Sequence, residues 1–238
     1  MSTDHPQWIA KDCLDVGLFT HQLEPMLAFW QQEIGLPFDH MLPLGGGVRQ
    51  HRHDHQGAVL KLNHARDPLS PASPGGYQRL IIARPGQTEA QDLTDPDGNQ
   101  VRLVPAGFDG VEHWAIEVAT RDAGTFFDHY HCALGLPRVE GDTIAVRCGR
   151  SLITGIIAPD IADKTDPNEM RRAGFRYTTI QVDKVDGVHA RAVERGAAEA
   201  AAPQTLGKTA RISFLKDHHG NWMELSQRAS ITGSLAPG

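Results

Sequence analysis

Apolar residues recur along the chain in two alternating patterns, which predict helices and strands in a repeated order. Intervals of three or four residues predict amphipathic helices at residues 24–34 and 122–134. Shorter, nearly continuous apolar runs are typical of buried strands. These predicted strands lie at residues 14–20, 77–83, 113–118 and 177–183, with two or three more before residues 63 and 157. Both halves of the chain therefore run from a strand to a helix and then to several strands.

Short sequence matches show that this order is an internal repeat. Gly35-Leu36-Pro37 recurs as Gly135-Leu136-Pro137, and the strand that begins at Tyr77 recurs at Tyr177, both at an offset of 100 residues. Two matches at one offset are unlikely to arise by chance. We therefore treat the two halves as structural counterparts.

A third match shows where the halves differ in length. Asp95-Pro-Asp-Gly-Asn99 corresponds to Asp217-His-His-Gly-Asn221 at an offset of 122, so the second half holds 22 additional residues. The alanine-rich stretch at 185–198 has helical spacing and predicts a helix in this insertion. In the first half only residues 85–90 occupy the same place, so we expect one helix fewer there.

Composition limits the classes of function. The chain has 238 residues, 40% of them hydrophobic, which is enough to bury a sizeable core. Its net charge of −6 is spread along the sequence, so nucleic acid is not an expected partner. The sequence has no apolar run of membrane-spanning length and no secretory pattern at residues 1–11, so we expect a cytoplasmic protein without a membrane partner. Three widely spaced cysteines, Cys13, Cys132 and Cys148, are expected to be reduced thiols.

Three segments together carry a resemblance to a known family. They are His-Trp-Ala-Ile-Glu-Val at 113–118, the helix end at 127–136, and the closing segment from Asp217 to Leu225. With these, the chain from about Cys13 to Gln227 resembles the vicinal oxygen chelate superfamily, which includes glyoxalase I, bleomycin-resistance proteins and extradiol dioxygenases. The resemblance implies an α+β fold of tandem βαβββ modules. These modules would form two half-barrel domains, at 12–106 and 111–228, and the first domain would lack one helix.

The same resemblance implies a metal site in the second domain. The family's ligand positions correspond here to His113 and Glu224, and an imidazole with a carboxylate suits Fe²⁺, Zn²⁺, Mn²⁺ or Ni²⁺. Strand alternation supports the assignment, because it turns His113, Glu117, Tyr177 and Glu224 toward one cavity. The alternative is that His113 and Glu224 only form hydrogen bonds in a metal-free pocket.

Tyr177 and Glu117 are the candidate catalytic residues. Extradiol dioxygenases place a second histidine where this chain has Tyr177, so their set of two histidines and one carboxylate is incomplete here. We expect Tyr177 to orient the substrate or donate a proton to it. Glu117 is the candidate general base, although a carboxylate at the solvated rim of the cavity would look the same in the sequence.

The first domain is expected to have lost its metal. Asp15 occupies the histidine position and Arg102 the glutamate position, so an ion pair between them, with Lys61 beside it, would replace the metal. The alternative is an anionic-substrate site built on Lys61 and Arg102.

Three alternate histidines, His51, His53 and His55, are a further candidate metal set. Their charged neighbours Arg49, Arg52 and Asp54, and the preceding glycines, favour a solvent-exposed hairpin instead.

These observations lead to three hypotheses about function. The first is a metal-dependent lyase or isomerase that stabilises an enolate-like anion on a small substrate with vicinal oxygens. The second is an Fe²⁺-dependent ring-cleaving dioxygenase, which would need a third ligand. The third is a metal-free protein that binds or sequesters a small molecule. The partner is a small molecule in each case, and the chain would be a monomer or a homodimer.

Overall fold

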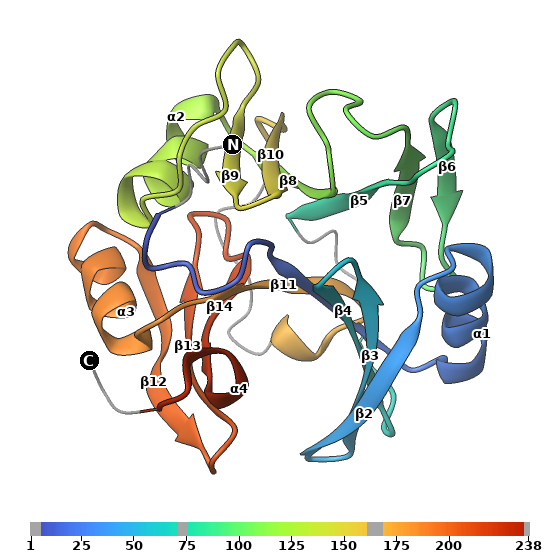
Figure 1. The fold of residues 1–238 in the computed structure, drawn as a ribbon, viewed down its shortest axis with the longest axis horizontal. Helices are drawn as coiled ribbons and strands as arrows, with labels where there is room; N and C mark the ends of the chain where they lie inside the picture. Colours follow the sequence, from blue (N-terminus) through green and yellow to red (C-terminus); the bar gives the residue numbers. More distant parts are fainter. Residues whose placement is uncertain (1–5, 71–75, 161–168, 236–238) are drawn as a thin grey trace.

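The computed structural model describes residues 6–70, 76–160 and 169–235, and it has two sheets with helices packed around them (Figure 1). The first module contains strands β1 (Asp15–Thr20), β2 (Phe38–Gly45), β3 (Val48–His55) and β4 (Ala58–Ala65). The second contains β5 (Tyr77–Ala83), β6 (Gln91–Thr94) and β7 (Gln100–Val104), and the third β8 (Trp114–Thr120), β9 (Ala145–Cys148) and β10 (Ser151–Ile157). The fourth contains β11 (Gly174–Gln181), β12 (Ala198–Leu206), β13 (Ala210–Lys216) and β14 (Trp222–Arg228).

The helices lie at the positions that the sequence predicts. Helix α1 (Leu23–Ala28) continues as a π-helical segment, Phe29–Glu33, and α2 (Ala123–Phe127) continues in the same way as Asp128–Ala133. Helix α3 (Val185–Glu194) lies between β11 and β12, whereas no helix occurs between β5 and β6, where every residue is described. The other helical segments are a 3-10 turn, Glu169–Arg171, and the short α4, Ala229–Thr232. The prediction of one helix fewer in the first half is confirmed.

The two repeated sequence motifs have structural causes. Gly35 and Gly135 follow the helices with φ angles of 76° and 78°, a left-handed backbone that glycine adopts without strain. Asp95 and Asp217 each accept two hydrogen bonds from backbone N–H groups of the following turn, at 2.9 to 3.0 Å. These bonds close the tight turns before β7 and β14, so the motifs specify chain reversal.

Each sheet combines strands from both halves of the chain. The eight-stranded sheet has the order β12-β13-β14-β11-β1-β4-β3-β2, and the six-stranded sheet has the order β6-β7-β5-β8-β10-β9. The first module thus pairs with the fourth through β1 and β11, and the second with the third through β5 and β8. The half-barrel fold class is as predicted. However, the expected division into 12–106 and 111–228 does not coincide with the sheets, because sequence repetition does not reveal which repeats pair.

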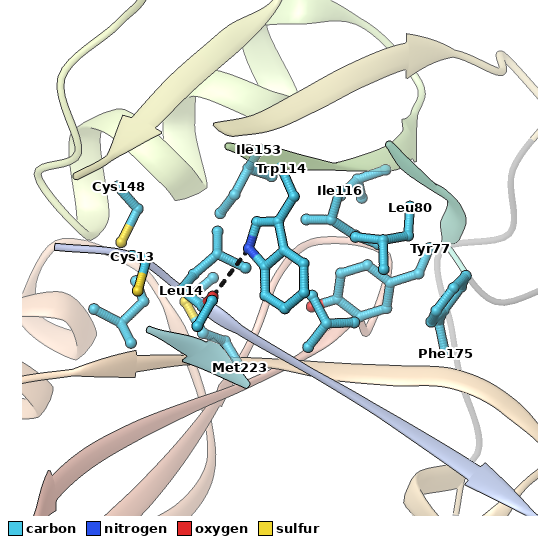
Figure 2. Close-up of a cluster of buried hydrophobic side chains, with 14 of the residues drawn as sticks. Cys13, Leu14, Tyr77, Leu80, Trp114, Ile116, Cys148, Ile153, Phe175 and Met223 are labelled. Atoms are coloured by element: carbon cyan, nitrogen blue, oxygen red, sulfur yellow. Dashed lines mark hydrogen bonds between the residues drawn. The ribbon is translucent and has the colours of Figure 1, made fainter. Parts of the chain in front are cut away.

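One apolar core connects the two sheets. Trp114 of β8 is fully buried, and its indole N–H donates a hydrogen bond of 3.1 Å to the backbone carbonyl of Leu14, just before β1 (Figure 2). Figure 2 also shows Met223 of β14 and Ile116 of β8 in the same cluster. Strands β1, β8 and β11 are buried along their whole length because other elements cover both faces. Within the described residues, no helix combines the length and the apolar character needed to cross a membrane.

His113, just before β8, forms a polar connection between the sheets inside this core. Its Nε2 donates to the backbone carbonyl of His55 at 2.9 Å, and its Nδ1 lies 3.2 Å from the Ser151 hydroxyl. The Ser151 oxygen in turn accepts a hydrogen bond from the backbone N–H of Leu14 at 3.2 Å. The imidazole is fully buried, and both of its nitrogens have partners.

We predict that His113 makes the stability of the protein depend on pH. Burial, with a smaller contribution from His55, lowers the pKa of His113 from 6.5 to about 4. Between these values the unfolded state binds more protons than the folded state, so stability decreases as the pH falls through this window. We expect His113→Gln to be less stable than wild type at pH 7. Between pH 7 and pH 5, the free energy of unfolding of this variant should fall by roughly 2 kcal/mol less than that of the wild type.

Urea denaturation of both proteins at the two pH values measures this difference. His40→Gln, which alters a histidine outside the core, serves as the control and should follow the wild-type dependence. Equal pH dependence in wild type and His113→Gln would show that His113 does not contribute.

Gly17 in β1 provides a test of the pairing between the first and fourth modules. It is paired with Tyr177 of β11, and a Cβ at this position would overlap the Tyr177 ring. We expect Gly17→Ala to lower the free energy of unfolding by about 1–3 kcal/mol because this ring is packed and hydrogen-bonded.

Gly187→Ala in α3 is the matched control, because the nearest atom to an added Cβ is a guanidinium nitrogen of Arg191 at 3.6 Å. Removing a glycine from a helix should raise stability by roughly 0.5–1 kcal/mol. The proposed pairing would be contradicted if Gly17→Ala were as stable as wild type in urea.

Candidate functional site

Three oxygen-bearing side chains lie in one row across the centre of the eight-stranded sheet. Asp15 of β1 is paired with Thr179 of β11, and Thr179 is paired with Glu224 of β14. Cross-strand partners place their side chains on the same face of a sheet. The row therefore brings two carboxylates and a hydroxyl together from the first and fourth modules.

Lys61 of β4 extends into this row and occupies the place where the oxygen atoms converge. Its ammonium group donates to Thr179 Oγ1 at 2.6 Å and to Glu224 Oε2 at 2.8 Å, and it lies 4.0 Å from Asp15 Oδ2. Thr179 in turn donates to Glu224 Oε2 at 2.7 Å. The residue opposite Lys61 in β1 is Gly17, whose missing side chain leaves room for the Tyr177 ring.

The protonation states of the cluster depend on burial and on mutual attraction. Burial lowers the pKa of Lys61, whereas Glu224 and Asp15 raise it and offset part of that effect. Burial alone raises the pKa of Asp15, but Lys11 at 2.5 Å and Lys61 outweigh it and hold this pKa below its ordinary value. Asp15 is therefore a carboxylate at neutral pH, with a cation on two sides.

Lys61 and Glu224 of this cluster line a cavity of about 550 Å³. Polar lining residues come from β3, β4, β11 and β14, and the apolar lining residues include Phe19, Leu42, Met170, Ile212 and Phe214. Concave sites of this size with a few convergent polar groups are typical of small-molecule binding.

The Tyr177 hydroxyl has a hydrogen available for a ligand in this cavity. Its oxygen accepts hydrogen bonds from the side-chain amides of Gln50 at 3.3 Å and Asn63 at 3.2 Å. Among the described residues no acceptor takes the hydroxyl hydrogen itself. Burial and the nearby Glu224 raise the pKa of Tyr177, so the group remains a donor at neutral pH.

Of the four predicted site residues, the structure brings Tyr177 and Glu224 together in this cavity. His113 and Glu117 do not line it. Glu117 belongs to β8 in the six-stranded sheet, and His113 immediately precedes that strand, whereas Glu224 belongs to the eight-stranded sheet. The expected convergence of His113 and Glu224 on one metal is therefore not what the structure shows. Strand alternation gives the face on which a residue lies, but not the sheet to which its strand belongs.

The residues present do not fit a divalent metal at either predicted ligand. His113 Nε2 carries a hydrogen for the His55 carbonyl, and its Nδ1 lone pair is directed at Ser151, so neither nitrogen is free to coordinate. Glu224 faces the Lys61 ammonium, which already occupies the position between the carboxylates. Across the parts of the chain that are described, no group of three or more His, Cys, Asp or Glu side chains could hold a metal ion.

The six-stranded sheet fills its corresponding face with ion pairs. Glu117, the predicted general base, accepts hydrogen bonds from Arg79 at 2.5 and 3.0 Å. Arg102 forms a two-bond ion pair with Asp92 of the neighbouring strand β6, at 2.6 and 2.7 Å. The expected pair between Asp15 and Arg102 is therefore wrong, because these residues lie in different sheets. The part of that prediction that placed Lys61 beside Asp15 is confirmed.

The three histidines of β3 are more buried than the sequence suggested. His53 and His55 are buried and His51 is partly exposed, so the prediction of an exposed hairpin is wrong. His55 stacks on Trp114 with ring centroids 5.1 Å apart, and His53 contacts Phe38. These histidines pack on the face of the strand opposite Gln50 and Arg52, the β3 residues that line the cavity.

Sequence reasoning missed Arg52, Arg228 and Asn63 as cavity residues. A signal for part of this set was present, because Lys61 and Asn63 are polar residues two positions apart in the mostly apolar β4. Such a pair on one face of a buried strand indicates a polar cavity. Arg228 ends the last strand, where sequence alternation gives no comparable signal.

Comparisons with known proteins agree with this fold. Glyoxalase I from Zea mays is 12% identical, with 90% of this chain and 92% of that chain covered and a TM-score of 0.72. A mutant of that enzyme is 11% identical, with coverage of 95% and 97% and a TM-score of 0.73. CppA protein from Streptococcus pneumoniae is 10% identical, with coverage of 93% and 99% and a TM-score of 0.54. At such identities these similarities show the shared fold alone.

No curated protein sequence matches the chain. A family model, however, matches residues 110–225, and its description is the Glyoxalase/Bleomycin resistance protein/Dioxygenase superfamily. This segment includes the whole third module and most of the fourth, and thus Tyr177 and Glu224 of the cavity. Residues 110–225 therefore match the glyoxalase, bleomycin resistance protein and dioxygenase superfamily, and 90% of the chain shares the fold of glyoxalase I from Zea mays.

Proposed function

We propose that the protein binds a small, oxygen-bearing organic molecule in the cavity of the eight-stranded sheet without a metal. The observation that carries this proposal is the position of Lys61, whose ammonium group contacts Thr179 and Glu224 and lies near Asp15. A cation held among these oxygens supplies the positive charge that a metal would otherwise bring. Of the three functions considered from sequence, metal-free binding is the one that this arrangement supports best.

The ligand would be held by groups that already point into the cavity. The Lys61 ammonium group and the Tyr177 hydroxyl both line the cavity, and the uncommitted hydroxyl offers a directed hydrogen bond. This is the orienting role expected for Tyr177 from sequence. The apolar side chains that line the cavity would cover the rest of the molecule and exclude water.

A second candidate function, proton transfer on a bound carbonyl compound, is favoured by the pairing of Lys61 with Tyr177. The lysine nitrogen lies 5.4 Å from the centre of the tyrosine ring, and the pKa of Lys61 is lowered while that of Tyr177 is raised. A small fraction of neutral amine could take a proton from a carbon next to a carbonyl group, while the tyrosine donates to the carbonyl oxygen. This would be lyase or isomerase chemistry without a metal.

Metal content tests the main proposal. Untagged protein from medium supplemented with iron, zinc, manganese and nickel should contain less than about 0.1 metal per chain by elemental analysis, because a charged lysine repels a cation. Added Zn²⁺ should not raise its melting temperature. In Lys61→Ala, where the carboxylates lose their cation, we expect Zn²⁺ to raise the melting temperature.

Lys208→Ala, which alters an exposed lysine, is the control and should behave as wild type. A stoichiometric metal in the wild-type protein that disappears in Glu224→Gln would overturn the proposal. That result would restore the metal-dependent enzyme.

Removal of the lysine side chain should also destabilise the protein. Lys61→Met leaves Asp15 and Glu224 without their shared cation, and loss of one partner of a buried ion pair costs about 3–5 kcal/mol. Denaturation in urea at pH 7 measures this loss, and Lys61→Met combined with Glu224→Gln should recover part of it. A variant with wild-type stability would show that the cluster does not hold the sheet together.

A further inference from the structure

Arg52 of β3 is a buried cation whose hydrogen-bonding capacity is only partly used. Its side chain lines the cavity and is 6% exposed. One terminal nitrogen, Nη1, donates to the Gln50 side-chain oxygen at 2.8 Å, but Nε is buried without a hydrogen-bond partner among the described residues. A buried N–H group without an acceptor is costly, so its presence in a cavity wall indicates an acceptor supplied from outside.

Arg228, at the end of β14, lines the same cavity close to Arg52. It is partly buried, and burial together with the Arg52 charge lowers its pKa. Within the described residues, neither arginine has a carboxylate within ion-pair distance. Like charges that share a poorly solvated cavity repel each other, so the protein alone does not balance them.

The carboxylates that act on Arg228 are Glu224, which lines the cavity, and Asp15, which does not, and both are already engaged by other cations. Asp15 is bonded to Lys11 at 2.5 Å, and Glu224 is bonded to Lys61 at 2.8 Å. These four side chains neutralise each other in pairs. The positive charges of Arg52 and Arg228 remain, and they face a space that also contains the free hydrogen of Tyr177.

We propose that the ligand of this cavity is an organic oxyanion, with its carboxylate or phosphate group held between Arg52 and Arg228 and its apolar body against Phe214 and Ile212. This inference rests on the proposed function and adds the chemical class of the molecule. Guanidinium groups bind both kinds of oxyanion through paired, charge-assisted hydrogen bonds. The apolar wall explains why an organic anion, rather than an inorganic one, would fill the cavity.

Calorimetric titration of the full-length protein with matched probes tests the inference. Naphthoate and naphthamide have the same aromatic body and nearly the same shape, but only naphthoate is charged. We expect naphthoate to bind at least about tenfold more tightly. Naphthyl phosphate then distinguishes the two sources of the anion: tighter binding than naphthoate indicates a phosphate monoester, and weaker binding a carboxylate.

Variants identify the groups responsible. Arg52→Gln and Arg228→Gln should each weaken naphthoate binding by roughly 10- to 100-fold and leave naphthamide binding within about twofold. Arg102→Gln, which removes an arginine of the other sheet, is the matched control and should bind both probes as wild type does. Arg228 lies at a strand end and is only partly buried, so its variant remains informative if Arg52→Gln does not fold.

The possible failures are distinguishable. Equal affinity of wild type for naphthoate and naphthamide would overturn the oxyanion inference and leave the proposed binding function intact. If the two arginine variants lost affinity for naphthoate and naphthamide equally, the oxyanion inference would also be overturned and the proposed binding function would remain. If neither probe binds the wild-type protein, both the inference and the proposed function are overturned.

Discussion

The Lys61 ammonium group is the interaction on which the rest of the site depends. It joins β4 to β11 and β14 through Thr179 and Glu224, and it lies beside Asp15 of β1. These four strands are consecutive in the eight-stranded sheet, so one cation connects the first module to the fourth. The same contact decides the chemistry, because Glu224, the carboxylate that lines the cavity, is already bonded to a cation. The chain thus has a built-in organic cation at the centre of its eight-stranded sheet.

The two sheets have used equivalent positions in different ways. The six-stranded sheet pairs Glu117 with Arg79 and Arg102 with Asp92, so these four charges are balanced. The eight-stranded sheet pairs its carboxylates with lysines, and Arg52 and Arg228 remain at the cavity wall. The charges on the six-stranded sheet thus balance each other, whereas the cavity of the eight-stranded sheet needs a ligand to balance its two arginines. The buried, neutral His113 belongs to the contact between the sheets and not to either site.

Much of the fold could be predicted from sequence because local patterns specify it. A few neighbouring residues determine the helical spacing, the glycines that end the helices and the turns that begin with Asp. The missing helix of the first half followed from the different offsets between matching segments of the two halves. Strand alternation also placed Tyr177 and Glu224 on the cavity side. Pairing of the first module with the fourth could not be predicted, because repeated sequences are equally compatible with pairing between neighbours. The assignment of His113 to a metal failed for that reason, since its partners Ser151 and His55 come from strands whose positions depend on long-range pairing.

Crystals soaked in Zn²⁺ or Mn²⁺ and measured at the metal's absorption edge would test the central claim most directly. The account predicts no anomalous peak within about 2.5 Å of the Glu224 carboxylate. It also predicts continuous density for Lys61 between Thr179 and Glu224. An anomalous peak that bridges Asp15 and Glu224, with the lysine side chain displaced, would contradict it.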